Sequence, residues 1–325
     1  MQCFALIVGL WFSLVAVATI AGHAQNYPSR TVRIVVPYPA GGPTDLVGRR
    51  VADALTKALN KPVIVENKSG AGGTIGSDAV AKSAPDGHTL LLGLMGPLSI
   101  APKIAPNLPY DPLKDLAPIR LVAIMPEVLV ARPQLGLRTL GEVVAFGKAN
   151  PGKLAIASAG SGSLPHLAAE LLKRETGIDA LHVPYRGAAP AINDLIGGQV
   201  HLMFGDGPVV LPQVTGKRLV AIVVATDKRL PVLPDVPTSI EAGFPTVRSE
   251  NWYGVLAPKG TPRPIIETLD RAVAAGMAEP NIEESFSKLG VYIVKEGTPE
   301  TFGEFLATQL DKWGGLAKEV GATVD

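Results

Sequence analysis

Short β-branched runs alternate with longer amphipathic stretches along the chain, and this alternation constrains the fold more than any other feature. Residues 32–36 are Val-Arg-Ile-Val-Val, which is typical of a buried strand. Apolar residues recur at helical spacing over 46–59, and the β-branched run 63–65 follows. Strands separated by amphipathic helices indicate βαβ units, so we predict an α/β fold whose sheets are mainly parallel and flanked by helices.

Two Pro-rich stretches interrupt this alternation, at residues 97–118 and 231–237. Such stretches are typical of connections, and we expect the first of them to lie at a lobe boundary. The 325 residues are long enough for two domains. The pattern therefore predicts a discontinuous first lobe and an inserted second lobe. The first comprises residues 25–125 and 240–325, and the second comprises residues 126–239.

The first 24 residues have the features of a secretory signal peptide. Residues 5–21 are almost entirely apolar, and Gly22 and Ala24 place small residues at positions −3 and −1 of a cleavage site. We therefore expect an exported protein. No Lys or Arg precedes the apolar run, and its length approaches the roughly 18 residues that span a bilayer. An uncleaved membrane anchor is the alternative.

Composition argues against several functional classes. The net charge is +1 and no basic run occurs, so nucleic acid is not an expected partner. The single cysteine, Cys3, lies inside the predicted signal segment, so cleavage would leave no thiol for a disulfide or for catalysis. Aromatic residues make up only 5% of the chain. Because sugar sites usually stack rings on Trp or Tyr, this scarcity disfavours a sugar ligand.

Two Gly-rich loops each follow a predicted strand and precede a predicted helix. They lie at residues 37–45 and 67–74. Glycine lets backbone N–H groups approach a ligand closely, and a helix N-terminus adds unpaired donors with partial positive charge. The loops therefore predict an anion site, which in the second loop includes Gly72 and Gly73. The alternative is that such a loop forms only a turn and a helix cap.

A Ser-rich loop occurs at residues 157–167, in the second block. Pro165 suits a first helical turn, and Ser163 suits the cap before it. The polar side chains expected around this helix start are Ser158, Ser161, Ser163 and His166. Hydroxyl groups and a partly positive imidazole are good donors to a carboxylate, so we predict a second part of the anion site here. The alternative is a capped helix with an exposed histidine.

Two charged residues follow later predicted strands. Asp206 comes after the predicted strand 200–204, and it either accepts a hydrogen bond from a ligand hydroxyl or amino group or caps the backbone. Arg186 lies in the loop 183–190 and faces either the ligand or solvent. In open α/β sheets, ligands bind beyond the carboxyl ends of the strands. Both residues are expected at such strand ends.

Some segments of the sequence partly match enzyme motifs, but none of these motifs is complete. Ser163 and His166 lie together, but no nucleophile-elbow signature accompanies them. The histidines lack a metal-binding spacing. Residues 147–154 approach a phosphate-binding loop, but Leu154 stands where a hydroxyl must bind Mg²⁺. We therefore expect a binding protein with no catalytic residue, no metal and no cofactor.

Six segments, in order along the chain, resemble one known family. They are IVVPYPAGGPTD at 34–45, GAGGTIG at 70–76, PDGHTL at 85–90, HVPYRG at 182–187, DLIGGQV at 194–200 and PDVPT at 234–238. With them, the chain resembles the Bug-type extracytoplasmic substrate-binding receptors of tripartite tricarboxylate transporters. The resemblance implies a periplasmic protein with the two-lobed Venus flytrap fold. Such a protein binds a small carboxylate and delivers it to membrane permease subunits.

The resemblance also implies which loops hold the carboxylate. It points to Ala40, Gly41, Gly42, Thr44 and Asp45 in the first lobe, and to Ser158, Ser161, Ser163, His166 and Asp206 in the second. The implied ligand is a dicarboxylate, a tricarboxylate or an aromatic acid. One alternative is a carboxylate-sensing receptor that acts on a two-component sensor kinase. Another is a Ser/His hydrolase.

Overall fold

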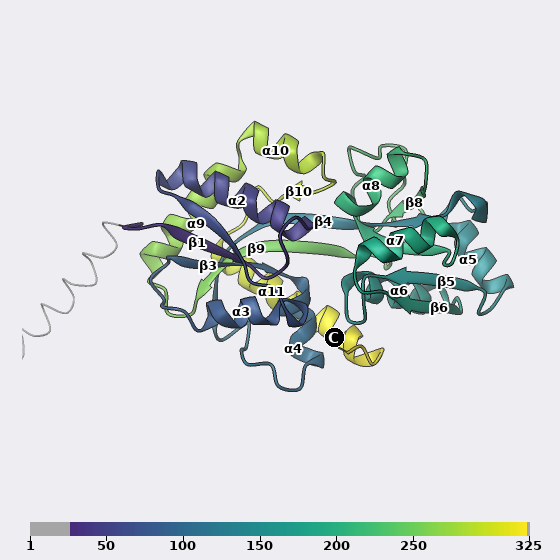
Figure 1. Cartoon of the computed structure of the whole chain (residues 1–325), viewed down its shortest axis with the longest axis horizontal. Helices are drawn as coiled ribbons and strands as arrows, with labels where there is room; N and C mark the ends of the chain where they lie inside the picture. The colour runs from purple at the N-terminus through teal and green to yellow at the C-terminus, as the bar shows by residue number, and fades with distance from the viewer. Residues whose placement is uncertain (1–26, 324–325) are drawn as a thin grey trace, which may run out of the picture.

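The computed structural model describes residues 27–323. The predicted signal segment at residues 1–24 lies outside this range. Within it, no helix is both long and apolar enough to cross a bilayer. The chain forms two lobes side by side along its long axis, and each lobe is a sheet with helices on both faces (Figure 1). The predicted two-lobed α/β fold is confirmed.

The first lobe has the strand order β2-β1-β3-β9-β4, with β10 beside β4. Its strands are β1 Val32–Val36, β2 Val63–Asn67, β3 Thr89–Leu94, β9 Glu250–Pro258, β10 Tyr292–Ile293 and the first part of β4 Leu116–Ala131. Its helices are α2 Pro43–Leu59, α3 Thr74–Ala81, α4 Ala101–Ile104, α9 Arg263–Met277, α10 Pro280–Ser287 and α11 Pro299–Glu319, with the short turns η1 Ala71–Gly73 and η2 Gly96–Ile100. Strand β1 pairs in parallel with β2 and β3, as βαβ units require.

The second lobe has the strand order β8-β4-β7-β5-β6. Its strands are the last part of β4, β5 Leu154–Ser158, β6 Ala180–Pro184, β7 Leu202–Asp206 and β8 Val220–Val224. Its helices are α5 Leu140–Ala149, α6 Leu164–Thr176, α7 Ala188–Gly197 and α8 Gly207–Thr215, with the short turn η3 Pro133–Leu135. Strand β5 runs parallel to β6 and β7, so this lobe also contains βαβ units.

Strand β4 belongs to both sheets and connects the lobes. It pairs with β9 up to Pro126, and it pairs with β7 from Glu127 onward. In Figure 1, β4 and β9 run along the middle of the molecule between the lobes. Because β4 is antiparallel to β7, β8 and β9, both sheets are mixed, and the prediction of mainly parallel sheets is corrected.

The Pro-rich stretch 97–118 does not connect the lobes, contrary to the prediction. It contains most of η2 and all of α4, which pack against α11 in the first lobe, and it ends in the first residues of β4. The true crossing strand is hard to see in the sequence because Pro118 and Pro126 interrupt it. Proline is rare inside a sheet, so the sequence indicates short separate runs in place of one long strand.

Each sheet is buried on both faces, which explains its nearly continuous apolar strands. In β1, Val32, Ile34 and Val36 face the core under α2, while Val35 faces the core on the side of α3 and α11. The second sheet has one core against α5 and α6 and another against α7 and α8. The loops at the strand ends are therefore carried by packed layers on both sides of the lobe boundary.

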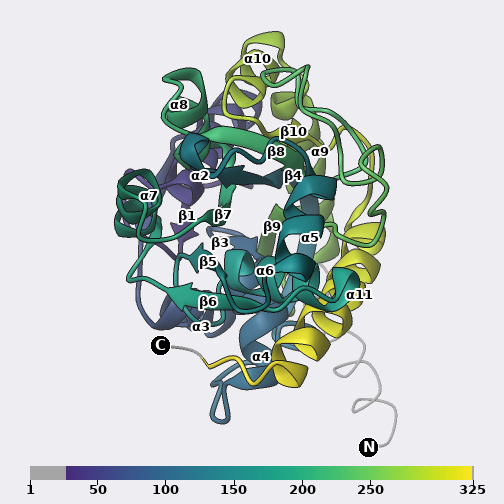
Figure 2. The ribbon, with the colours of Figure 1, turned by 90° about the vertical axis from the view of Figure 1, so that its right-hand side faces the viewer.

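The C-terminal helix α11 packs against η2, α4 and β4 in the first lobe and against α6 in the second. Figure 2, a view along the long axis, shows α11 along one side of the molecule. Arg174 Nη1 in α6 lies 3.4 Å from Glu319 Oε2 in α11. Beyond the helix, Thr323 Oγ1 lies 3.4 Å from Ser161 Oγ in the Ser-rich loop. Thr323 thus contacts the second lobe at the loop that the sequence predicts as a binding loop.

Candidate functional site

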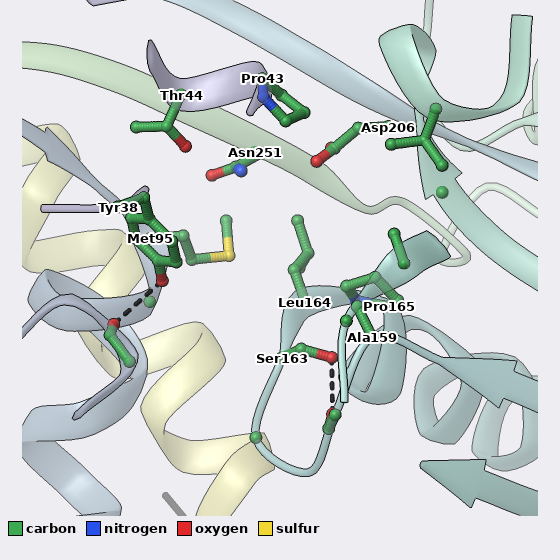
Figure 3. Close-up of a pocket in the computed structure, with 18 of the residues that line it drawn as sticks. Tyr38, Pro43, Thr44, Met95, Ala159, Ser163, Leu164, Pro165, Asp206 and Asn251 are labelled. Carbon is green, nitrogen blue, oxygen red and sulfur yellow. Dashed lines mark hydrogen bonds between the residues drawn. The ribbon is translucent and has the colours of Figure 1, made fainter. Parts of the chain in front are cut away.

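A cavity of about 890 Å³ lies between the two lobes. Figure 3 shows side chains from both lobes around it, with Tyr38, Thr44 and Met95 of the first lobe across from Leu164 and Pro165 of the second. Much of the lining is apolar, and the larger apolar side chains include Met95, Ile100, Leu164, Met203 and Val209. A cavity of this size and composition, with few polar groups, is typical of a small-molecule site.

Four helices begin at this cavity. The lining residues at their starts are Pro43 and Thr44 of α2, Leu164 and Pro165 of α6, Ala188 of α7, and Asp206 directly before α8. A helix N-terminus carries N–H groups without an intrahelical partner and a partial positive charge. Gly42 and Gly187 have no side chain with which to cap α2 and α7, and the side chain of Asp206 makes no capping bond to any described residue. The cavity therefore attracts an anion through backbone groups.

Asp45 shapes the first-lobe loop from behind the cavity. Its carboxylate accepts hydrogen bonds from Gly41 N at 2.9 Å, Arg49 Nε at 2.8 Å and Asn67 Nδ2 at 2.9 Å. Burial alone would raise the pKa of Asp45, but these hydrogen bonds, led by that from Arg49, lower it. Gly41 adopts a φ of +83°, which favours glycine. The loop before α2 is thus fixed by an ionised carboxylate that does not line the cavity.

Tyr38 forms part of the first-lobe wall. Its hydroxyl donates a hydrogen bond to Gly72 O at 2.9 Å, which joins the two Gly-rich loops. Burial raises the pKa of Tyr38 to about 12, so the phenol stays protonated at neutral pH. A Cβ atom on Gly96 would lie 2.8 Å from the phenol oxygen. Gly96 therefore leaves the room that this side chain occupies.

The Ser-rich loop forms the facing wall. Ser163 caps α6 as predicted, because its Oγ accepts a hydrogen bond from His166 N at 3.4 Å, and it also donates to Gly160 O at 2.6 Å. Gly162 has a φ of +70°, and a Cβ atom there would lie 2.6 Å from Thr323 O. This loop is therefore held by its own cap and packs closely against Thr323.

A pair of stacked histidines lies behind this loop and outside the cavity lining. His166 and His182 are 3.9 Å apart between ring centroids, and His182 Nε2 lies 2.7 Å from Ser158 Oγ. Burial lowers the pKa of His166, and burial with the neighbouring His166 lowers the pKa of His182 to about 4. Both rings are neutral at pH 7. His166 therefore does not supply the partly positive imidazole predicted from the sequence.

His166 and His182 also approach Glu170, and one ligand atom from each of the three lies within 4.8 Å of the others. Gly162 N donates to His166 Nδ1 at 3.1 Å, so the neutral ring carries its proton on Nε2. His166 Nε2 is the atom 4.0 Å from Glu170. A protonated nitrogen cannot bind a metal ion, and Lys173 already pairs with Glu170 at 2.9 Å. The cluster fits a structural pair better than a metal site.

Two carboxyl groups face each other in the wall on the side of Asn251. Glu127 on β4 and Asp206 on β7 are direct partners in the antiparallel register, and both line the cavity. Glu127 is fully buried, and Ser249 Oγ donates to its Oε2 at 2.9 Å. Burial together with the Asp206 charge raises the pKa of Glu127, and burial raises that of Asp206 to about 6. In Figure 3 Asp206 and Asn251 point toward the same space.

The predicted site residues divide into two groups. Those that line the cavity are Thr44, Gly72, Ser161, Ser163 and Asp206. Those that lie behind or beside it, outside the lining, are Ala40, Gly41, Gly42, Asp45, Gly73, Ser158 and His166. Their ligand contacts remain predictions. Four further lining residues, Tyr38, Met95, Glu127 and Asn251, were not predicted as site residues from the sequence. Glu127 and Asn251 lie on β4 and β9, the strands that cross between the lobes, and no local sequence pattern marks that crossing.

Comparison with known proteins identifies the family. The model of the "Tripartite tricarboxylate transporter family receptor" matches residues 47–322. "Protein BugT" of Bordetella pertussis is 38% identical over 317 residues, which cover 97% of each chain.

Two solved structures share the fold over nearly their whole length. The periplasmic binding protein BugD is 39% identical with a TM-score of 0.78, over 91% of this chain and 99% of BugD. MatC from Rhodopseudomonas palustris, which has bound malate, is 35% identical with a TM-score of 0.77, over 90% of this chain and 100% of MatC. The family predicted from the sequence is confirmed. The chain belongs to the receptors of the tripartite tricarboxylate transporter family and is of the Bug type.

Proposed function

We propose that this protein is a periplasmic receptor that binds a small carboxylate between its lobes. It delivers the ligand to the membrane permease subunits of a tripartite transporter and catalyses no reaction. The observation that carries the proposal is the convergence of the N-termini of α2, α6 and α7, from both lobes, on one cavity. Their N–H groups suit carboxylate oxygens, and MatC, a relative of the same fold, binds malate.

We infer that the lobes close on the ligand, because the helix N-termini around the cavity come from both lobes. α2 belongs to the first lobe, whereas α6, α7 and α8 belong to the second. A carboxylate ligand that spans the cavity gains its full set of donors only when both lobes approach it, so binding favours the closed state. The closed receptor then presents a surface to the permease that the open receptor lacks.

The boundary at 125/126 is supported by β4, which changes partner between Pro126 and Glu127. We propose to move the second boundary from 239/240 to a point near Ser249. Ala242, Phe244 and Val247 pack on the second-lobe core, so the segment before β9 belongs to that lobe. The hinge then consists of two neighbouring strand positions, one on β4 and one at the start of β9.

The burial of the Ser/His pair argues against the alternative of a Ser/His hydrolase. Ser158 lies 2.7 Å from His182 Nε2, which is the distance expected of a nucleophile and its base. However, Ser158 is fully buried and lies outside the cavity lining, so a substrate in the cavity has no access to its oxygen. Ser163, which does line the cavity, donates to a backbone carbonyl and caps a helix. The pairing of Ser158 with His182 is consistent with a structural role.

The proposal is tested by calorimetric titration of the mature protein with dicarboxylates, tricarboxylates and aromatic acids. We expect saturable binding of at least one class at micromolar or lower concentration. The variant Ala159→Phe places a ring in the cavity wall and should weaken that binding by about tenfold or more. The matched control is Ala145→Phe, on the exposed face of α5 in the same lobe. No binding to any of the three classes, or equal binding by both variants, would contradict the proposal.

A further inference from the structure

The buried carboxyl pair Glu127 and Asp206 has features that a purely structural pair would lack. Within residues 27–323, neither Glu127 Oε1 nor Asp206 Oδ1 has a hydrogen-bond partner, although both atoms are buried. Asp206 occupies the N-cap position of α8, yet its side chain makes no capping bond to any described residue. Buried polar atoms are nearly always paired. Both oxygens are closed to solvent, so the partner that they lack is a proton held between the two carboxyl groups. Asp206, which is only half-buried and lines the cavity, is the member of the pair that a ligand can meet.

The position of the pair prevents both groups from being ionised together. Directly opposed residues of an antiparallel pair have Cβ atoms about 4.5–5.5 Å apart, so two negative charges there repel strongly in a buried setting. In the described part of the chain, no salt bridge joins a cation to either carboxyl group. The two groups therefore do not both ionise, and burial, which raises the pKa of each, favours a proton held between them.

The surrounding charged or titratable groups do not neutralise the negative charge that remains on the pair. They are Tyr38, Tyr253, Arg186, Asp227, Arg248 and Glu250. Burial raises the pKa of both tyrosines, so they are neutral. Arg248 pairs with Asp227 and Glu250, at 3.3 Å each. Arg186 lines the same cavity from the loop after β6, and its charge suits the ligand carboxylate.

We propose that Glu127 and Asp206 form a proton-holding carboxyl pair that determines specificity. Asp206 accepts a hydrogen bond from an ammonium or hydroxyl group of the ligand, and protonated Glu127 keeps the pair at a single negative charge. The site therefore prefers a carboxylate that bears such a donor over the unsubstituted acid of the same length. This inference rests on the proposed function. It assumes that the ligand carboxylate lies at the helix N-termini, and it assigns Asp206 as the acceptor for a donor group at the other end of the ligand.

Matched ligands isolate the donor group. Succinate, malate and aspartate share one four-carbon skeleton and differ in a hydrogen, a hydroxyl and an ammonium, and glutarate, 2-hydroxyglutarate and glutamate form the five-carbon set. At pH 7.5 we expect the best substituted acid to bind about tenfold or more tightly than its unsubstituted partner. Acidification to pH 5 protonates Asp206 and should reduce an ammonium preference, whereas a hydroxyl preference should change little. Equal affinities within both sets at pH 7.5 would overturn the inference.

Two variants separate the roles of the pair. Asp206→Asn should reduce the ratio between substituted and unsubstituted acids to about twofold or less, and Asp235→Asn on the exposed surface should leave it unchanged. Glu127→Gln mimics the protonated carboxyl and should keep the preference. A preference that survives in Asp206→Asn would overturn the assigned role of Asp206.

The proton itself can be detected without a ligand. Infrared difference spectroscopy of wild type against Glu127→Gln at pH 7.5 should show a protonated carboxyl band that Glu304→Gln, an exposed control, leaves intact. Absence of this band would overturn the proton-holding pair regardless of any ligand. If the band is present but no acid of any class binds, the proposed function fails and, with it, the selectivity, while the shared proton stands.

Discussion

The starts of α2 and α8 make an instructive comparison, because both helices begin at the same cavity and each has an aspartate at its start. Asp45 in α2 accepts three hydrogen bonds and lies behind the loop, and its pKa is lowered. Asp206 before α8 lines the cavity, its buried Oδ1 has no partner among the described residues, and its pKa is raised to about 6. The residue type is the same, and the difference lies in the donors around it.

This difference separates a structural carboxylate from a functional one. Asp45 is stabilised as an anion, so the fold depends on its charge. Asp206 is destabilised as an anion, so the fold would be more stable without its charge. A buried charge that destabilises the fold is typical of a functional site, where a ligand provides the missing partner. The two helix starts therefore predict opposite responses to mutation.

The largest expected effect is the loss of Asp45. Asp45→Ala leaves Gly41 N and Asn67 Nδ2 without their acceptor and should lower the free energy of unfolding by about 2–4 kcal/mol at pH 7.5. Because the pKa of Asp45 is lowered by folding, this contribution is present above the ordinary carboxyl pKa and fades as the pH falls below it. Urea unfolding measures the effect.

The control is Asp53→Ala in the same helix, whose exposed partner Arg50 lies at 3.8 Å, and we expect a change of about 0.5 kcal/mol or less. If the Asp45 and Asp53 variants lost the same stability, the structural role of Asp45 would be wrong.

A gain of stability is expected at the other helix start. Asp206→Asn removes a buried charge and should raise the free energy of unfolding by about 2 kcal/mol at pH 7.5. The folded-state pKa is raised from 3.8 to about 6, so the destabilisation by the wild-type carboxyl is complete above pH 6 and fades as the pH falls toward 4. Urea unfolding at pH 7.5 and pH 4.5 tests this trend. A destabilised variant at pH 7.5 would show that Asp206 supports the fold as Asp45 does.

The smallest expected effect concerns the loop that Asp45 holds. Gly41→Ala forces a side chain into a φ of +83° and should cost about 1 kcal/mol of stability. Gly42 has a φ of −82°, and a Cβ atom there would approach no described atom closer than 3.6 Å, so Gly42→Ala is the matched control. Thermal unfolding of both variants measures the difference. Equal unfolding temperatures would show that the left-handed turn at Gly41 is not required.

Local sequence patterns predict the helix starts well. Gly-rich or Ser-rich segments before amphipathic stretches locate the starts of α2 and α6, and Ser163 caps α6 as expected. These features depend on residues within a few positions of one another. The family resemblance, carried by motifs in the same loops, is confirmed by the comparisons.

Side-chain direction and long-range pairing are not predictable in this way. Asp45 turns behind its loop because Asn67, 22 residues away, donates to it. Glu127 reaches the cavity because β4 pairs with β7, whose residue Asp206 lies opposite it. Neither contact leaves a local pattern in the sequence. For this reason the loops of the site were predictable, whereas the buried carboxyl pair was not.

In the proposed complex, the helix N-termini hold the ligand carboxylate and Asp206 accepts a hydrogen bond from the donor at the other end of the ligand. A crystal structure with the tightest-binding acid tests this arrangement most directly. We predict carboxylate oxygens at about 2.7–3.2 Å from backbone N–H groups at the starts of α2 and α6, with a ligand donor on Asp206. A ligand carboxylate placed against Asp206, or a ligand outside the cavity between the lobes, would contradict the account.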